Sequence, residues 1–248
     1  MASTSETGHA KNIAHFQSLI SFCTGYGATY NPVKAAIKVT SMKARLQAVQ
    51  TAVSDLATAN TAYQNAVNAR FTAFADLRSL ATRVINALAV SGATPATLAD
   101  AKTFNRKIQG KRASTPKEAT PPADTPPGTP AKDTVSASQQ SYDKLIEHFS
   151  NILELLAQEP LYVPNETALQ LAALQSFRDN LADLNNAVIT AYTPASNKLI
   201  ARDQLMYAPG TGMVDIGLDA KSYVKALFGS TSPQYKQVNA LKFRNIYR

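Results

Sequence analysis

The sequence predicts an all-α fold of two similar helical bundles with long amphipathic helices. Three observations support this prediction: an alanine-rich composition, apolar residues at helical spacing in both halves, and short matching segments in the same order in each half. Alanine accounts for 41 of the 248 residues, and it favours helices because it loses no side-chain entropy there. Only residues 36–40 and 161–163 resemble strands, and both segments are short.

A proline- and threonine-rich segment divides the chain. Six of the thirteen prolines lie between Pro116 and Pro130, and no periodic apolar residue occurs from about residue 111 to 138. This composition cannot bury a core and is typical of an extended linker. We therefore predict a flexible N-terminus over residues 1–8, a first helical repeat over 9–110, the linker over 111–138 and a second helical repeat over 139–248.

Five short segments of the first half recur in the second half in the same order. The first-half segments begin at His15, Tyr30, Thr61, Val84 and Phe104, and their counterparts begin at His148, Tyr162, Thr190, Val224 and Phe243. The offset between counterparts lies between 129 and 133 at first and then rises by about ten. An extra loop over about residues 207–217 accounts for this rise. The pattern predicts a tandem duplication of one domain.

Each repeat is expected to begin with an amphipathic helix. Residues 9–23 place Ile13, Phe16 and Leu19 on one face, and residues 141–157 have the same pattern. Each repeat is also expected to finish with a short helix, since Thr94-Pro95 and Ser232-Pro233 combine a capping residue with proline at the first helical position.

The longest helical pattern lies in the first half. Thirteen positions from Leu46 to Leu88 step by three and four residues, and eleven of them are apolar or aromatic. The pattern fits one long helix or a hairpin that turns near Asn60 or Asn65. We favour the long helix with a weak point at Tyr63 and at its proposed counterpart, Tyr192. Thr193 and Pro194 follow Tyr192 and predict a kink or a restarting helix there.

The two polar residues inside this long pattern are Asn60 and Arg70. Polar residues at seam positions of packed helices often fix the register or face a partner. Asn60 and Arg70 are therefore candidate register positions, and Arg70 alternatively marks a place where the seam opens to water.

No group of residues predicts an enzyme. His15 and His148 occupy matching positions, but neither has a nearby second ligand, so we interpret both as half-buried helix residues and not as a metal pair or a proton relay. Cys23 lies on an apolar helix face and is interpreted as a core residue. The segment 25–27 has two glycines but does not follow a strand, so it does not predict a phosphate loop. We predict no catalytic residue, metal or cofactor, and nominate no small-molecule substrate.

The net charge of +8 is unevenly distributed. Residues 1–110 carry +7, residues 141–219 carry −6, and residues 220–248 carry +6. Each repeat therefore ends in a basic segment that contains aromatic residues, a combination that suits RNA or single-stranded nucleic acid. The simpler interpretation is that these cations complement a helix C-terminus and stay solvated. The candidate contacts with an anionic partner are Lys102, Phe104, Arg106, Lys107, Lys242, Phe243, Arg244, Tyr247 and Arg248.

These observations favour a non-enzymatic structural or scaffolding protein that binds another protein or itself as a homo-oligomer. The alternative is a basic protein that associates with nucleic acid or the ribosome through the two repeat ends. The N-terminus lacks a signal-peptide pattern, and the longest uncharged stretch, residues 12–33, contains polar residues and a proline. We therefore expect a cytoplasmic protein that does not insert into membranes.

Overall fold

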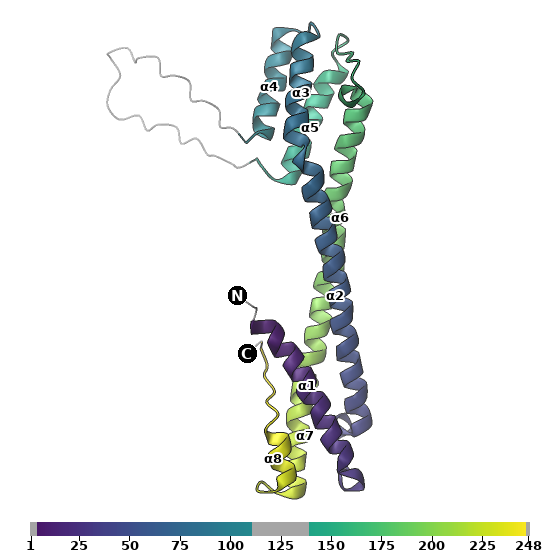
Figure 1. Ribbon diagram of the computed structural model, residues 1–248, viewed down its shortest axis with the longest axis vertical. Coiled ribbons are helices and arrows are strands. Elements are labelled where there is room, and N and C mark those ends of the chain that lie inside the picture. The colour runs from purple at the N-terminus through teal and green to yellow at the C-terminus, as the bar shows by residue number, and fades with distance from the viewer. Residues whose placement is uncertain (1–3, 111–138, 247–248) are drawn as a thin grey trace, which may run out of the picture. The chain divides into compact units, whose positions relative to one another are not determined.

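The structure is a computed structural model that describes residues 4–110 and 139–246, with side chains described from residue 8 onward. The described residues form helices and no strand, so the all-α prediction is confirmed (Figure 1). Across the described ranges, no helix combines the length and the apolar character that crossing a membrane requires. The predicted linker at 111–138, and Tyr247 and Arg248, lie outside the described residues. The α-helices are α1 (Thr4–Gly25), α2 (Val39–Ala75), α3 (Leu77–Val90), α4 (Pro95–Ile108), α5 (Tyr142–Ala157), α6 (Leu171–Tyr207), α7 (Met213–Phe228) and α8 (Pro233–Asn239).

The chain forms two compact units that do not coincide with its two sequence halves. Unit 1 contains the residues up to Tyr63 and those from Ala191 onward, and unit 2 contains Gln64–Thr190. This division differs from the predicted arrangement of one bundle per half. The physical reason is the length of α2 and α6, because each begins in one unit and ends in the other. The helices that precede and follow each long helix therefore pack in different units.

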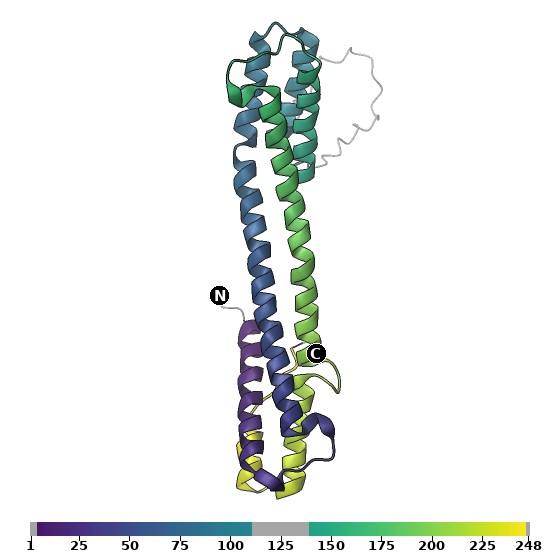
Figure 2. The same ribbon diagram turned by 90° about the vertical axis from the view of Figure 1, so that its right-hand side faces the viewer.

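Unit 1 combines α1, the first part of α2, the last part of α6, and α7 and α8 (Figure 2). Helix α7 packs against α1, against α8 and against the short 3-10 helix η2 (Ala35–Ile37). The core of this unit contains buried side chains from every one of these helices, among them Phe16, Leu19, Met42, Val49, Met206, Met213, Val224 and Val238.

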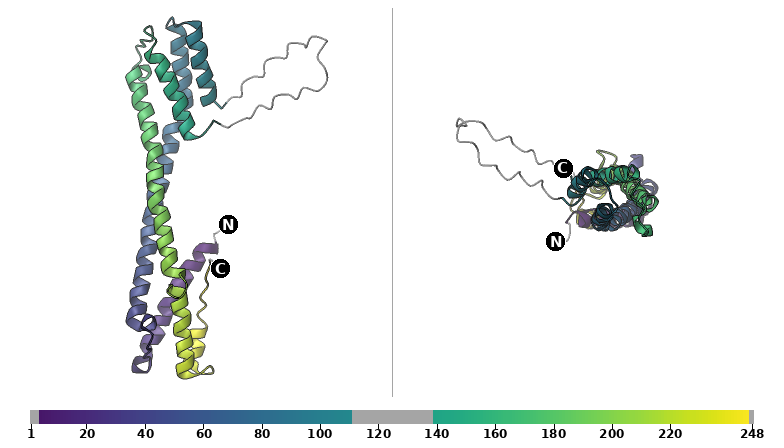
Figure 3. Two further views of the ribbon diagram at one scale, coloured as in Figure 1. Left: turned by 180° about the vertical axis from the view of Figure 1, so that it is seen from behind. Right: turned by 90° about the horizontal axis from the view of Figure 1, so that it is seen from above.

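Unit 2 combines the last part of α2, the helices α3, α4 and α5, and the first part of α6 (Figure 3, left). Helix α4 packs against both α3 and α5, and α3 also contacts the short 3-10 helix η3 (Thr167–Leu169). The core is again apolar, with Leu77, Leu88, Ile108, Phe149, Ile152, Leu174 and Leu181 fully or almost fully buried.

The two halves have the same order of elements, and their boundaries correspond closely. Helices α2 and α6 both have 37 residues, and their first and last residues are 132 positions apart. The Tyr30 hydroxyl donates a 2.8 Å hydrogen bond to the carbonyl of Ile37 beside α2, and the Tyr162 hydroxyl donates an equal bond to Leu169 beside α6. By this offset Tyr63 corresponds to Ala195, which corrects the correspondence with Tyr192 that the sequence indicated.

Helices α3 and α7 also correspond, but at a larger offset. The buried residues Leu77, Ala81, Val84, Ile85 and Leu88 of α3 match Met213, Gly217, Ala220, Lys221 and Val224 of α7, each 136 positions on. Only Asp76 separates α2 from α3, whereas residues 208–212 separate α6 from α7. Of the segment 207–217, where the sequence predicts an extra loop, residues 208–212 lie between the two helices, whereas 207 ends α6 and 213–217 begin α7.

The predicted long helix over residues 46–88 is confirmed only as far as Ala75. Helix α2 continues through Asn60, Tyr63 and Asn65 and ends there, and the rest of the run belongs to the separate helix α3. The hairpin alternative is wrong. The predicted restart at Thr193 is also wrong, because α6 continues through Pro194. Helix α1 begins at Thr4, five residues before the start that the sequence predicted for this helix.

The two predicted short-helix starts are confirmed. The Thr94 hydroxyl accepts from the Thr97 amide at the start of α4, and the Ser232 hydroxyl accepts from the Tyr235 amide at the start of α8. Pro95 and Pro233 occupy the first helical position, where a missing amide hydrogen costs nothing.

Candidate functional site

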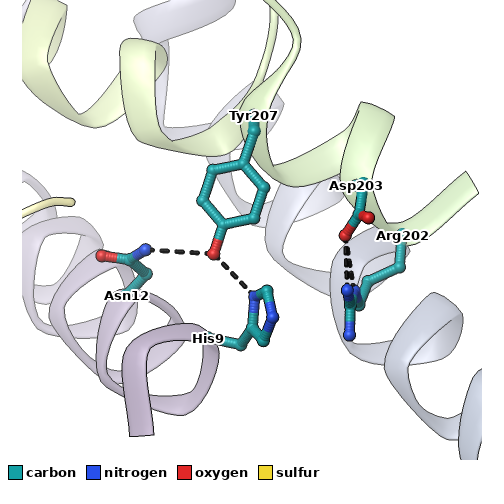
Figure 4. Close-up of polar contacts among 5 residues, drawn as sticks. All are labelled: His9, Asn12, Arg202, Asp203 and Tyr207. Atoms are coloured by element: carbon teal, nitrogen blue, oxygen red, sulfur yellow. Dashed lines mark hydrogen bonds and ion pairs between the residues drawn. The ribbon is translucent and has the colours of Figure 1, made fainter. Parts of the chain in front are cut away.

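A polar cluster in unit 1 joins the beginning of α1 to the end of α6 (Figure 4). His9 and Asn12 are one helical turn apart on α1, so both side chains face the same neighbour. The Nδ1 atom of His9 lies 2.6 Å from the Tyr207 hydroxyl, and Asn12 Nδ2 lies 3.4 Å from the same oxygen. Tyr207 and Asn12 are buried. The cluster therefore satisfies polar groups inside the unit.

Asn12 also anchors the C-terminal segment. Its side-chain amide donates to the Arg244 carbonyl at 2.8 Å and accepts from the Arg244 amide at 3.0 Å. One turn further along α1, the Nδ1 atom of His15 donates to the Lys242 carbonyl at 2.9 Å. Two side chains of α1 thus hold the extended backbone that follows α8.

Arg202 and Asp203 form an ion pair on α6, beside this cluster. Arg202 donates from Nε and Nη2 to one carboxylate oxygen of Asp203, at 2.8 and 2.6 Å. The two side chains are only 12% and 21% exposed. This partial burial reduces the solvent screening of the pair and distinguishes it from the exposed ion pairs of the chain, such as Lys198 with Asp55.

A cavity of about 350 Å³ opens between α1, α2 and α6. His9, Ala10 and Ile13 line it from α1, Val53 and Asn60 from α2, and Arg202 from α6. Most of the wall is apolar, and the polar groups are an imidazole, an amide and a guanidinium. A volume near the lower end of the range of ligand sites, with few polar groups, suits a small molecule.

The predicted anionic-partner residues lie on two separate surfaces. Lys102, Phe104, Arg106 and Lys107 are on α4 in unit 2, whereas Lys242, Phe243 and Arg244 follow α8 in unit 1. Lys102, Lys242 and Arg244 are exposed to solvent.

The aromatic rings of these two segments are used in packing. Phe104 packs against the core of unit 2, and Lys107 Nζ lies 5.5 Å from its ring centroid. Phe243 contacts Phe16 edge to face and lies directly over Gly217, where an added Cβ would come within 2.8 Å of the ring. Both rings are partly buried.

Arg70, a predicted register position, is at the centre of a polar network in unit 2. It donates a 2.9 Å hydrogen bond to Asn185, and Asn185 donates a 2.7 Å bond to Asp143. The Arg70 guanidinium also lies 4.0 Å from the centre of the Tyr142 ring. Asn60, the other predicted register position, is exposed and lines the cavity of unit 1.

The structure places the two matching histidines in different surroundings. His15 is half-buried and hydrogen-bonded, whereas His148 is 3% exposed and neither of its ring nitrogens has a hydrogen-bond partner. Burial, followed by the nearby charge of Lys107, lowers the pKa of His148. The described residues contain no group of three or more His, Cys, Asp or Glu side chains that could hold a metal ion.

Cys23 lies in the core of unit 1, as the interpretation from its apolar helix face requires. The residue is a buried free thiol, and burial raises its pKa to about 11. Because the thiolate is the nucleophilic form, a thiol with this pKa is unreactive at neutral pH.

Sequence reasoning missed an exposed apolar face on α6. Tyr192, Leu199 and Ile200 are 57%, 41% and 53% exposed. They are spaced by seven and eight residues, so they lie on one face of the helix. Met206 and Tyr207 are one heptad beyond Leu199 and Ile200, and both are buried. The spacing could have been read from the sequence, but only the structure shows where the covering helices end.

No protein-family model matches this sequence, and no curated protein and no solved structure matches it either.

Proposed function

We propose that this chain is a non-enzymatic scaffold that self-associates through the exposed apolar face of α6, formed by Tyr192, Leu199 and Ile200. The observation that supports this proposal is a change in burial between positions of α6 that are seven residues apart. Met206 and Tyr207 are covered by other helices of unit 1, whereas Leu199 and Ile200, one heptad earlier on the same face, are not. An apolar helix face that is buried in the core at one end is suited to pack against another helix along its whole length.

A second copy of the chain is the occupant that fits this face. The three apolar side chains carry no charge, and a two-fold interface brings the same residues from both copies together. An uncharged face avoids the like-charge repulsion that such self-contact would otherwise create. The face is also continuous with an existing helix contact, since Tyr207 packs on α1 through His9. A partner helix would therefore extend a packing surface that the fold already uses.

We further propose that the scaffold arose by tandem duplication and that the two halves exchange partners. The equal lengths of α2 and α6, the repeated Tyr30 and Tyr162 hydrogen bonds and the matching buried positions of α3 and α7 support this proposal. Each unit then contains one complete set of helices, half of which comes from each repeat.

The nucleic-acid alternative has weaker support. Lys102, Lys242 and Arg244 are exposed and Arg106 and Lys107 are half-buried, but Phe104 and Phe243 pack against the protein. Because Phe104 and Phe243 are used in packing, we expect any binding to depend mainly on phosphate contacts and to weaken steeply with salt. Salt-sensitive binding of single-stranded RNA that is lost when Arg106, Lys107, Lys242 and Arg244 are reversed in charge would restore this alternative.

The test is the oligomeric state of the full chain, measured by sedimentation equilibrium over a range of concentrations. We expect the wild-type chain to associate as its concentration rises, and the double variant Leu199→Glu with Ile200→Glu to remain monomeric with an unchanged helical circular dichroism spectrum. Asn197→Glu is the matched control, because Asn197 is exposed on the same turn but outside the apolar face. A wild-type chain that stays monomeric at every concentration would overturn the proposal, as would a double variant that associates equally well.

A further inference from the structure

The cavity of unit 1 has a counterpart in unit 2 that is filled by protein side chains. Helices α1 and α5 correspond at an offset of 133, as the buried residues Phe16 and Phe149 show, and α2 and α6 correspond at an offset of 132. By these offsets four residues at the cavity have counterparts at the Arg70 network. His9 matches Tyr142, Ala10 matches Asp143, Val53 matches Asn185, and Arg202 matches Arg70.

In unit 2 these positions form a closed cluster. The Tyr142 ring lies under the Arg70 guanidinium at 4.0 Å and contacts Phe74 edge to face, with 4.7 Å between the ring centres. Asn185 and Asp143 continue the cluster through hydrogen bonds of 2.9 and 2.7 Å. An aromatic ring on a guanidinium face, with polar groups at its edge, thus fills this position.

In unit 1 the same positions hold smaller, apolar or differently directed side chains. Ala10 is smaller than Asp143, and Ala10 and Val53 both lack the hydrogen-bonding groups of their counterparts Asp143 and Asn185. The His9 ring points to Tyr207, with 5.5 Å between the ring centres (Figure 4). Arg202 keeps its place on the wall, and the cavity of about 350 Å³ lies beside it.

We propose that this cavity binds a small planar aromatic molecule, which takes beside Arg202 the place that the Tyr142 ring takes beside Arg70. Arginine stacks on aromatic faces through its delocalised planar cation, and burial strengthens the attraction. The apolar wall of Ile13, Val53 and Leu56 contacts the remaining ring surface, and the Asn60 amide provides a polar group for a ring substituent. The available volume fits one ring or two fused rings.

The experiment uses 2-naphthol as the probe and measures its fluorescence anisotropy with increasing amounts of the full chain. The chain has no tryptophan, and its ten tyrosines do not absorb in the long-wavelength band of 2-naphthol, so excitation in that band avoids interference from the protein. We expect saturable binding to the wild-type chain. Ala10→Phe places a ring in the cavity and should weaken binding about tenfold or more. Ala14→Phe is the matched control, since Ala14 is exposed on the same helix and does not line the cavity.

A second variant transfers the residues of unit 2 to unit 1 through His9→Tyr, Ala10→Asp and Val53→Asn. We expect this triple variant to lose probe binding, because its own tyrosine ring occupies the position on Arg202. Leu199→Glu with Ile200→Glu should keep probe binding, which separates the cavity from the apolar face of α6. Absence of saturable binding to the wild-type chain, or equal binding by the Ala10→Phe and Ala14→Phe variants, would overturn the proposal. Circular dichroism confirms that each variant is folded.

Discussion

Arg70 and Asn185 are joined by a 2.9 Å hydrogen bond in unit 2, although 115 positions separate them in the sequence. The bond links α2 to α6 and belongs to a network that also contains Tyr142 and Asp143. Asn185 is buried, and the Nε atom of Arg70 is buried without a partner of its own. The side-chain amide of Asn185 is therefore the group through which Arg70 and Asp143 are connected.

Replacing Asn185 by leucine should destabilise unit 2. The substitution removes the acceptor of the half-buried Arg70 guanidinium, whereas Asp143, which loses its donor, is exposed and stays solvated. We expect the free energy of unfolding to fall by about 1–3 kcal/mol, measured by urea denaturation. The control is Asn186→Leu, which changes an exposed neighbour on the same helix. Equal stability of the two variants would show that the network contributes nothing.

The paired tyrosine hydrogen bonds give a second prediction. Tyr30 and Tyr162 are buried, and each hydroxyl donates at 2.8 Å to a carbonyl seven residues further along the chain. Tyr30→Phe and Tyr162→Phe should each lower the free energy of unfolding by about 1–2 kcal/mol, because each leaves a buried carbonyl unpaired. The two losses should add, since the residues lie in separate units. Tyr192→Phe, at an exposed site, should change stability little, and a cost equal to that of Tyr30→Phe would contradict this explanation.

The local structure was predictable from the sequence, and the pairing of helices was not. Pro95, Pro233 and the periodic run through Tyr63 have local causes, so capping and helical spacing were sufficient to predict the elements. The spacing of apolar residues shows that a helix has a buried face, but not which helix covers it. For this reason the sequence indicated one bundle per half, whereas each compact unit draws on both halves.

The candidate site shows the same limit. Arg70 and Asn60 were identified as unusual because they interrupt an apolar pattern in their own helix. Asn12 and Tyr207 interrupt no such pattern, and their hydrogen bonds join residues 195 to 232 positions apart. Arg202 interrupts none either, and the other residues that line its cavity are at least 142 positions away. Phe104 and Phe243 were assigned to a basic surface for their neighbours in sequence, although their rings pack inward.

Pro194 gives a third prediction, because it lies inside α6 and not at a helix start. Proline has no amide hydrogen, so the Thr190 carbonyl loses its bond four residues on, and the ring crowds that carbonyl. Pro194→Ala should restore this bond and raise the free energy of unfolding by about 1–3 kcal/mol. Asn197→Ala, at another exposed position of α6, controls for the general gain in helix propensity. A Pro194→Ala variant that is no more stable than Asn197→Ala would mean that the surrounding helix already compensates for the proline.

His148 predicts how stability depends on pH. The residue is buried, neither ring nitrogen has a hydrogen-bond partner, and its pKa is lowered from about 6.5 by burial and then by Lys107. Lys144 acts in the same direction, and Glu147 opposes both. The unfolded chain therefore binds a proton at a higher pH than the folded chain does. Well above pH 6.5, His148 should make no pH-dependent contribution to the free energy of unfolding. As the pH falls through 6.5, protonation of His148 in the unfolded chain should lower this free energy. The decrease should level off below the pKa of His148 in the folded chain.

The measurement is urea denaturation at several pH values between 8 and about 5. His148→Leu should remove the part of the pH dependence that begins near 6.5, and should be more stable than the wild type at the acidic end. Lys107→Ala should weaken the same dependence, because removing a positive charge raises the folded pKa of His148 towards its ordinary value. Lys102→Ala, at an exposed position of the same helix, should leave the dependence in place. If the free energy of unfolding of His148→Leu keeps the wild-type slope against pH near 6.5, another group causes that slope. The buried imidazole would then not explain a loss of stability in acid.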